Sequence, residues 1–278
     1  MAQDSKIEWT DHTFNPWIGC TNISPGCDRC YAESWSKRSG LVKWGNNPRR
    51  RTSEPYWKAP LKWQAAAGAF ESIHGRRQRV FCASLADVFD NKADKIWRKD
   101  LFDLIDATPA LDWLLLTKRP QNISKMLPVN WPAAGRKNVW LGTTAEDQAR
   151  FDQRWPILAK VPAAIKFISY EPAIGPLRLP ASGPWPDWLI SGGESGHGAR
   201  PMNPQWARDV IADCKRFGVA AFHKQWGAFR NNPLCFEEGF SAKEAEARDM
   251  HGKGGGLLDG QLHRNFPNGS GRISTVAA

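Results

Sequence analysis

The segment VFCASLADVFDNKADKIWRKDLFDLIDATPALDWLLLTKRP, residues 80–120, decides the fold that we expect for this chain. It begins with the apolar run VFCASL (80–85) and contains a second one, WLLLT (113–117), and both runs are typical of buried strands. Between them, residues 94–108 carry apolar side chains at helical spacing. A strand, a helix and a second strand in this order predict two parallel strands joined through the helix.

The same alternation continues along the chain on both sides of this segment. A second helix is predicted over residues 204–218, where a Lys/Arg-rich last turn and Gly218 favour a helix end. The other expected strands are IEWT (7–10), VWLGT (139–143), KFISYE (166–171), DWLISGG (187–193) and AAFHKQW (220–226). Near-continuous apolar strands suit a parallel sheet buried on both faces, which is either doubly wound or a (β/α) barrel.

Polar residues at the strand ends favour the barrel. They are Ser84, Asp87, Lys118, Arg119, Thr143, Thr144, Glu146, Glu171, Glu194, Lys224 and Gln225. In a (β/α) barrel the carboxyl ends of the strands converge on one face, where active sites of this fold are built. A solvent-facing loop would also be polar, but six strands in succession with such residues are harder to explain in that way.

We therefore expect an α/β fold, a partial (β/α)6-type TIM barrel, over residues 1–227. At about residues 36–79 the pattern gives way to a basic stretch with interleaved aromatic residues, which we interpret as an insertion. Residues 228–278 are Gly-rich, with a short helical stretch around SAKEAEARDM (241–250), and are interpreted as a C-terminal extension or lid.

The composition is that of a globular protein, with 41% hydrophobic and 24% charged residues. No run approaches the roughly 20 apolar residues that span a bilayer, and the first residues, MAQDSKIEWTD, lack the regions of a signal peptide. We therefore expect a cytoplasmic monomer without membrane contact. The net charge of +10 indicates either a polyanionic partner such as nucleic acid or a basic, well-solvated surface.

Three of the six cysteines, Cys20, Cys27 and Cys30, fall within eleven residues in the pattern CxxxxxxCxxC. Clustered thiols in a reducing compartment indicate a metal site rather than disulfides. The spacing alone leaves two kinds of site open, a structural zinc and an iron–sulfur cluster. Cys82 and Cys214 lie in apolar patterns and are expected in the core.

The cysteine segment HTFNPWIGCTNISPGCDRCYAE (12–33) resembles that of a phage-associated three-cysteine-motif family related to radical S-adenosylmethionine (radical SAM) enzymes. Further segments match this family: SLADVFD (84–90), LLLTKRP (114–120), VWLGTTAED (139–147), FISYEPAIGPL (167–177), SGGESGHGARPM (191–202) and FHKQWG (222–227). The chain departs from the usual radical SAM spacing, CxxxCxxC, by three extra residues between the first two cysteines. The resemblance implies a barrel of the radical SAM type.

The resemblance also implies a mechanism. A [4Fe-4S] cluster on Cys20, Cys27 and Cys30 would receive an electron from a reductant such as flavodoxin or ferredoxin and cleave S-adenosylmethionine to a 5′-deoxyadenosyl radical. Residues expected to bind the cofactor are Ser84, Lys118, Thr143, Glu146, Glu171 and Glu194, and their alternative role is an internal ion-pair network. Tyr170 is a candidate radical relay or hydrogen donor, with packing in a strand as its alternative.

The basic aromatic stretch suggests a substrate. Arg49, Arg50 and Arg51 are expected to contact phosphates, and Trp44 and Trp57 to stack on unstacked bases, unless the stretch is a surface loop stabilised by tryptophans. We therefore expect a radical SAM enzyme acting on nucleic acid, namely a DNA repair or modification enzyme similar to spore photoproduct lyase. The alternatives are the same chemistry on a small molecule or peptide, and a non-catalytic zinc-containing nucleic-acid-binding protein.

Overall fold

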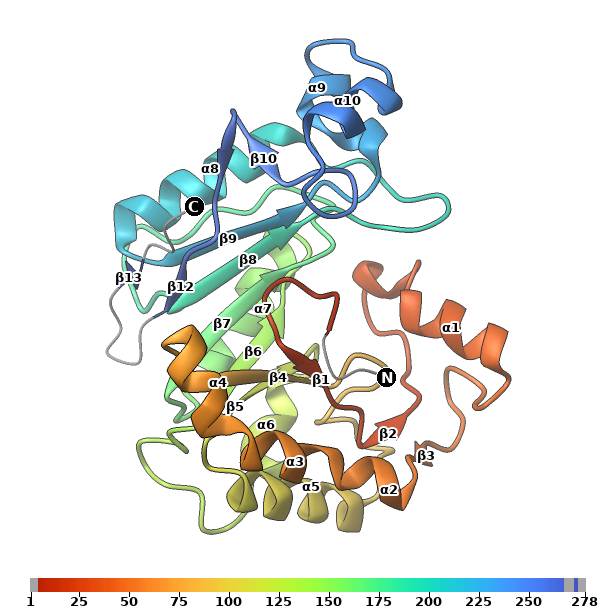
Figure 1. Ribbon diagram of the computed structural model, residues 1–278, viewed down its shortest axis with the longest axis vertical. Coiled ribbons are helices and arrows are strands. Elements are labelled where there is room, and N and C mark those ends of the chain that lie inside the picture. The colour runs from red at the N-terminus through yellow and green to blue at the C-terminus, as the bar shows by residue number, and fades with distance from the viewer. Residues whose placement is uncertain (1–4, 268–272, 275–278) are drawn as a thin grey trace. The chain divides into compact units, whose positions relative to one another are not determined.

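The computed structural model describes residues 5–267 and 273–274 (Figure 1). The chain forms two compact units. Unit 1 comprises Met1–Ile23, Cys30–Gly142 and Val161–Ala164, and unit 2 comprises Ser24–Arg29, Thr143–Lys160 and Ile165–Ala278. No division between them falls at residue 227, so the separation of the chain into a barrel and a C-terminal extension stays a prediction.

Seven strands are hydrogen-bonded in one sheet, in the order in which they occur along the chain. They are β1 (His12–Thr13), β4 (Gln78–Cys82), β5 (Leu111–Thr117), β6 (Val139–Thr144), β7 (Ile165–Tyr170), β8 (Trp188–Gly192) and β9 (Ala220–Gln225). The pairs β1–β4 and β4–β5 in unit 1 and β7–β8 and β8–β9 in unit 2 are parallel. Sequential parallel order is the topology of a (β/α) barrel, whereas a doubly wound sheet reverses its order midway. The predicted α/β class with partial-barrel topology is confirmed.

The first strand of unit 1 differs from the predicted one. Residues 7–10 form a turn, in which the amide of Thr10 donates to the carbonyl of Ile7 at 3.0 Å, so the prediction of a strand there is wrong. The strand is instead the dipeptide His12–Thr13, which pairs in parallel with Val80 and Phe81. The aromatic ring of Trp9 packs on the edge of Phe81 and contributes to the core rather than to the sheet.

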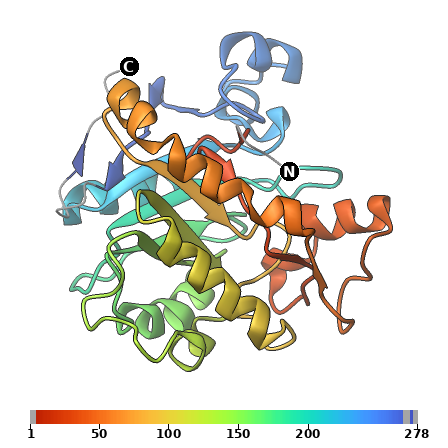
Figure 2. The ribbon, with the colours of Figure 1, turned by 60° about the horizontal axis from the view of Figure 1, so that its bottom comes forward.

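The predicted insertion is largely the connection between β1 and β4. It holds β3 (Arg50–Arg51), which pairs antiparallel with β2 (Trp17–Ile18), and then α2 (Glu54–Trp57), α3 (Ala59–Ala65) and α4 (Ala67–His74). The three helices follow one another almost without interruption (Figures 1 and 2). Parallel neighbouring strands need such a crossover. The stretch is therefore structural over most of its length.

Helix α5 (Lys95–Ala107) follows the prediction for residues 94–108. The side chain of Asp94 accepts a hydrogen bond from the amide of Ile96 at 2.8 Å and so caps the helix. The helix buries Leu101, Phe102 and Ile105. Shorter elements of unit 1 are α1 (Tyr31–Ser39), a 3-10 turn at Pro120–Asn122 and α6 (Ile123–Met126).

In unit 2, α7 (Gln148–Ala159) and α8 (Pro204–Phe217) accompany the strands. Helix α8 confirms the prediction for residues 204–218, and it ends at Gly218, whose φ of 71° is the left-handed conformation that glycine adopts readily. Cys214 on this helix is fully buried, as expected.

The described part of the extension belongs to the core of unit 2. It contains a 3-10 turn at Phe229–Asn231, α9 (Pro233–Phe236), α10 (Ala242–Arg248) and the short strands β10 (Leu257–Leu258), β11 (Gln261–Leu262), β12 (Phe266–Pro267) and β13 (Ile273–Ser274). The carbonyl of His263 accepts from the amide of His223, and the amide of Asn265 donates to Ala221, so this segment covers the free edge of β9. Residues 268–272 and 275–278 of the predicted lid lie outside the described residues. None of the helices described is long and apolar enough to cross a membrane.

His223 on β9 makes the stability of the protein sensitive to acid. Its ring is fully buried, with Nδ1 3.0 Å from the hydroxyl of Ser191, and burial, followed by the positive charges of Arg264 and His263, lowers its pKa to about 3. The folded state therefore keeps this imidazole neutral, while the unfolded chain binds a proton below about pH 6.5. The free energy of unfolding should fall as the pH drops from about 6.5 towards about 3.

We expect the His223 contribution to cost about 1.6 kcal/mol between pH 6.5 and pH 5, because the unfolded histidine is half protonated at pH 6.5 and a full proton is worth about 1.4 kcal/mol per pH unit. Urea unfolding at both pH values measures it. His223→Asn should flatten the pH dependence by that amount, whereas His251→Asn, a change at an exposed histidine, should not. Equal pH dependence in all three proteins would contradict the assignment.

Candidate functional site

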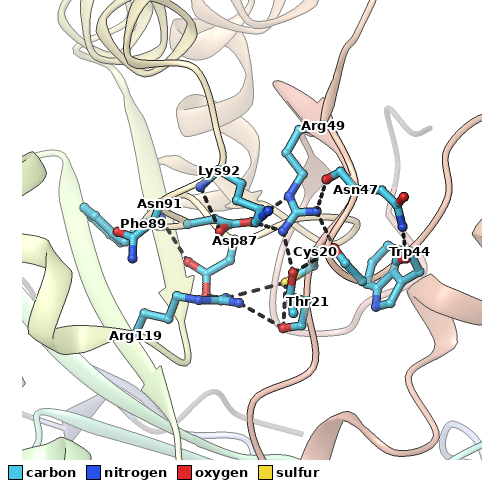
Figure 3. A network of polar contacts seen from close by, with 12 residues as sticks. Cys20, Thr21, Trp44, Asn47, Arg49, Asp87, Phe89, Asn91, Lys92 and Arg119 are labelled. Atoms are coloured by element: carbon cyan, nitrogen blue, oxygen red, sulfur yellow. Dashed lines mark hydrogen bonds and ion pairs between the residues drawn. The ribbon is translucent and has the colours of Figure 1, made fainter.

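The peptide around Cys20 is held by a buried ion pair of unit 1 (Figure 3). Arg119, just after β5, places Nη1 3.0 Å from Oδ2 of Asp87 and 3.5 Å from the sulfur of Cys20. Its Nη2 donates to the carbonyl of Thr21 at 2.9 Å. The guanidinium thus contacts both the thiol and the backbone that follows it. The sequence places Arg119 among the polar residues at strand ends, whereas the predicted cofactor-binding residue is its neighbour Lys118.

A second buried ion pair holds the same peptide from the other side. Nη2 of Arg49 lies 2.6 Å from Oδ2 of Asp90 and donates to the hydroxyl of Thr21 at 2.8 Å. The side chain of Arg49 is 0% exposed. The prediction that Arg49 contacts nucleic-acid phosphates is therefore wrong, because its charge is already neutralised inside unit 1.

Both acids come from the loop Asp87–Asp90 that follows β4. Asp87 Oδ1 accepts from the amide of Phe89 at 2.9 Å and from the hydroxyl of Thr117 at 2.7 Å, which fixes the carboxylate in place. A buried carboxylate with this many donors is a rigid support for a guanidinium. The motifs SLADVFD and LLLTKRP thus act together on the Cys20 peptide.

The environment of the Cys20 thiol disfavours its negatively charged form. Burial, followed by the nearby charge of Asp87, raises its pKa to about 11, although the Arg119 guanidinium works in the opposite direction. A metal ligand must be a thiolate, so cation contact at this sulfur favours the ligating form.

Cys30 precedes α1, and the residues around it are tied to the predicted site residue Ser84. The hydroxyl of Tyr31 donates to the carbonyl of Ser84 at 2.7 Å, and Nδ2 of Asn15 donates to the Ser84 hydroxyl at 3.0 Å. Lys118 is half-buried, and its amide donates to Asp87 Oδ2 at 3.1 Å. Ser84 and Lys118 therefore both lie in unit 1 beside groups that support the cysteine peptides.

The turn that carries Cys27 (Pro25–Cys27) belongs to unit 2 and is held by the predicted residue Glu146. Oε1 of this fully buried carboxylate accepts from the amide of Gly26 at 3.1 Å, and Oε2 lies 2.8 Å from Nη1 of Arg154. A Cβ on Gly26 would lie 3.0 Å from the Glu146 carboxyl carbon, so glycine permits the approach. Glu146 positions the Cys27 turn; the expected contact with the cofactor is not supported.

Glu194 supports the same turn through Arg200. Its Oε2 accepts from the amide of Arg200 at 2.9 Å and from Nε at 3.0 Å, and Arg200 Nη2 in turn donates to the carbonyl of Pro25 at 2.8 Å. Arg29 adds a longer ion pair of 3.4 Å. Burial raises the pKa of Glu194, but the hydrogen bonds from Arg200 outweigh it and hold the pKa below its usual value. Glu194 thus supports the Cys27 turn through Arg200, and its binding of the cofactor stays a prediction.

The remaining predicted residues of unit 2 are engaged within that unit. Glu171 lies 2.9 Å from Nζ of Lys224, and Thr143 is fully buried. The hydroxyl of Tyr170 donates to the carbonyl of Gly175, and burial, followed by the charges of Asp147 and Asp209, raises its pKa. Tyr170 thus has a packing position, and its role as a radical relay stays a prediction. For the three glutamates, the ion-pair alternative describes their contacts.

Gly193, the second glycine of the SGGE motif, has a structural explanation in unit 2. A Cβ on Gly193 would lie 2.6 Å from the carbonyl carbon of Trp226, and nearer still to its oxygen, so only glycine lets these backbones meet. Gly193→Ala should lower the free energy of unfolding by about 3 kcal/mol, because neither backbone can move away cheaply. Gly68→Ala, in helix α4 with no atom within 4 Å, should be neutral or stabilise by up to about 1 kcal/mol. Equal effects in urea unfolding would contradict this explanation.

The residues predicted to bind nucleic acid do not form one surface. The guanidinium carbon of Arg51 lies 4.1 Å from the centre of a Trp57 ring, and the guanidinium pairs with Asp100 at 2.7 Å. Trp57 is 8% exposed, so the prediction that it stacks on bases is wrong. Trp44 is half-buried, with Nε1 donating to Asn22 at 3.1 Å, and Arg50 is exposed.

The donor chemistry of the cysteine segment fits an iron–sulfur cluster, since Cys20, Cys27 and Cys30 are all free of disulfides. Over residues 5–267 and 273–274, however, no three or more His, Cys, Asp or Glu side chains are gathered as a metal site requires. The cluster, like the zinc alternative, therefore rests on the donor set and the sequence. Cys82 is fully buried, as predicted, and burial raises the pKa of its thiol well above the usual value.

The fold and the site define an α/β protein with partial-barrel topology whose buried ion pairs support cysteine-bearing peptides. The chain belongs to the family described as protein of unknown function DUF5131, whose model matches residues 4–267. No curated protein matches the chain. A solved structure of spore photoproduct lyase, a mutant with bound AdoMet and dinucleoside spore photoproduct, is similar to it with 13% sequence identity and a TM-score of 0.42. This similarity covers 88% of the chain and 62% of that protein's chain, so the chain spans less than two thirds of it.

Proposed function

We propose that this protein is a radical SAM enzyme in which Cys20, Cys27 and Cys30 hold a [4Fe-4S] cluster, and that it acts on nucleic acid in DNA repair or modification. The cofactor is S-adenosylmethionine, and a flavodoxin or ferredoxin is the reductant. The assignment of the cluster ligands comes from the cysteine spacing and the family resemblance. The phage association of the family is part of that resemblance.

One observation carries the proposal: the buried ion pairs beside the cysteines support the peptides next to them. In unit 1, Arg119 and Arg49 both bind Thr21, the residue after Cys20. In unit 2, Glu146 and Arg200 bind the turn that contains Cys27. Burying charged groups is costly, and we infer that these pairs are retained because they fix the geometry of the cysteine peptides. The reactive side chains on these peptides are thiols, so we infer that the ion pairs hold the thiols in position.

The side chains of the protein would have distinct roles around a bound cluster. When bound, a three-cysteine cluster supplies an electron and one iron with an open coordination position. With a cluster bound, Arg119 would donate to the sulfur of Cys20 and offset the charge of the thiolate, while Asp87 keeps that guanidinium in place. Hydrogen bonds to ligating sulfurs tune the reduction potential of such clusters, so Arg119 is a positioning and tuning residue.

Metal analysis separates this proposal from the zinc alternative. After anaerobic reconstitution, we expect a brown protein with about four irons per chain and a broad visible absorption that bleaches on reduction. A colourless protein with about one zinc would support the non-catalytic alternative instead.

Nucleic-acid binding rests on the net charge of +10 and on the exposed Arg50, since Arg49 and Trp57 are buried. We expect the affinity for a single-stranded oligonucleotide to fall steeply with salt. Arg50→Glu should lower the affinity and reduce the salt slope by about 1, whereas Lys160→Glu, the same charge change in unit 2, should not. Absence of salt-dependent binding would favour a small-molecule or peptide substrate.

A further inference from the structure

Unit 1 contains a cavity of about 750 Å³ that takes no part in the cysteine site. Its lining residues come from the segment 91–106, which includes most of α5, and from residues 125–136. This volume is within the range of small-molecule binding sites, about 300–1,000 Å³.

Arg98 on α5 is the buried charge of this cavity. Arg98 is 5% exposed. Its Nε donates to the carbonyl of Val88 at 2.9 Å, and its Nη2 donates to the carbonyl of Asp90 at 2.7 Å. Among the described residues, no carboxylate lies within ion-pair distance of it and Nη1 has no hydrogen-bond partner. Burial lowers the pKa of Arg98, although the more distant charges of Asp90, Asp87 and Asp94 work in the opposite direction, so their attraction does not fully offset the cost of burying this guanidinium. An anion in the cavity would offset this cost.

The rim adds further positive charge. Lys99 pairs with Asp103 at 2.6 Å and Arg136 pairs with Asp106 at 2.8 Å, so these four charges cancel. Lys95 and Lys125 also line the cavity, are exposed, and have no acidic partner within the described part of the chain. Together with Arg98 they leave an excess of three positive charges, which suits a phosphate group better than a neutral ligand.

The other part of the lining is apolar. Phe102 is buried in the wall, Met126 is half-buried, and Val129 is fully exposed. Free phosphate would make no favourable contact with these apolar residues, whereas a ligand with a ring system would cover them.

We propose that this cavity binds a small ligand of the nucleotide class, with its phosphates at Arg98, Lys95 and Lys125 and its ring against the apolar residues. Arg98 also ties the site to the loop Asp87–Asp90 through the carbonyls of Val88 and Asp90. The binding requires no S-adenosylmethionine cleavage and does not rest on the proposed function.

Isothermal titration of the full-length protein with ADP, adenosine, inorganic phosphate and a single-stranded oligonucleotide tests this proposal. ADP should bind saturably at one site, and adenosine and phosphate should each bind at least about tenfold more weakly, because each supplies only half of the contacts. Oligonucleotide binding at Lys95 and Lys125 without ADP binding would overturn the small-ligand assignment in favour of a nucleic-acid surface.

Variants locate the site. Lys95→Glu combined with Lys125→Glu changes two exposed residues and should weaken ADP binding by about tenfold or more. Lys62→Glu, at an exposed position of α3 outside the cavity, should change it by less than about twofold. Arg98→Gln should abolish ADP binding, but it also removes support from residues 88–90, so the double lysine variant decides. Equal weakening by Lys62→Glu, or no saturable ADP binding to the unaltered protein, would overturn the proposal.

Discussion

Replacement of Cys20, Cys27 or Cys30 by alanine is expected to abolish cluster binding. Each residue is proposed to supply one of three thiolate ligands, and alanine supplies none, so iron and sulfide should fall from about four per chain to near zero. Iron and sulfide analysis after anaerobic reconstitution measures the effect, and electron paramagnetic resonance of the reduced protein identifies the cluster. Thermal unfolding of each variant separates ligand loss from misfolding.

The matched controls are cysteines outside the motif. Cys82→Ala removes a fully buried thiol and should cost about 1 kcal/mol of stability without loss of iron. Cys235→Ala removes a half-exposed thiol and should change neither the stability nor the iron content. Full iron content in Cys20→Ala, or a loss in Cys82→Ala as large as in the motif variants, would refute the ligand assignment.

Asp87→Asn is expected to destabilise unit 1 strongly. The substitution preserves the shape of the side chain but leaves Arg119 without its counterion, and both residues are less than a tenth exposed. Breaking a buried ion pair in this way costs about 3–5 kcal/mol. Denaturant unfolding at neutral pH measures the change.

The control for this prediction is Asp103→Asn, which breaks an ion pair on the surface of α5. Lys99 and Asp103 are 74% and 58% exposed, and such pairs contribute about 0.5 kcal/mol or less. Arg119→Lys should retain most of the stability but shift the reduction potential of the reconstituted cluster, because a lysine cannot contact Cys20, Asp87 and Thr21 together. Equal effects of Asp87→Asn and Asp103→Asn would contradict the supporting role of the buried pair.

The main elements of the sheet could be predicted because their signals are local. Strand β5 contains an unbroken apolar run, and α5 combines a capping Asp94 with apolar residues at helical spacing. Strand β1 has no such signal. His12 and Thr13 become a strand through their pairing with Val80 and Phe81, nearly seventy residues away in the chain, and no local pattern encodes that contact.

The three consecutive arginines 49–51 show where the prediction of the site failed. Treated alike in the sequence, they have three different environments: Arg49 is buried against Asp90, Arg50 is exposed, and Arg51 stacks on Trp57. Strand β3 turns successive side chains to opposite faces, and the acidic partners of Arg49 and Arg51, Asp90 and Asp100, lie on distant segments of the chain. Composition reveals the charge of such a stretch but not which charges are already neutralised.

The glutamates at the strand ends illustrate the same limit in unit 2. Glu146 and Glu194 follow their strands and support the turn that carries Cys27, whereas Glu171 pairs with Lys224. Whether they contact a ligand or the loop itself depends on Arg154 and Arg200, which follow eight and six residues later. Arg200 follows Glu194 by six residues within SGGESGHGAR, and this close spacing of opposite charges is a sequence signal for the ion pair.

The most direct test of the proposed enzyme is S-adenosylmethionine cleavage by the reconstituted protein. Under anaerobic conditions, reduced protein incubated with S-adenosylmethionine should form 5′-deoxyadenosine, measured by liquid chromatography and mass spectrometry, and Cys20→Ala should form none. An intact, reducible cluster that forms no 5′-deoxyadenosine would contradict the assignment of radical SAM chemistry to this protein.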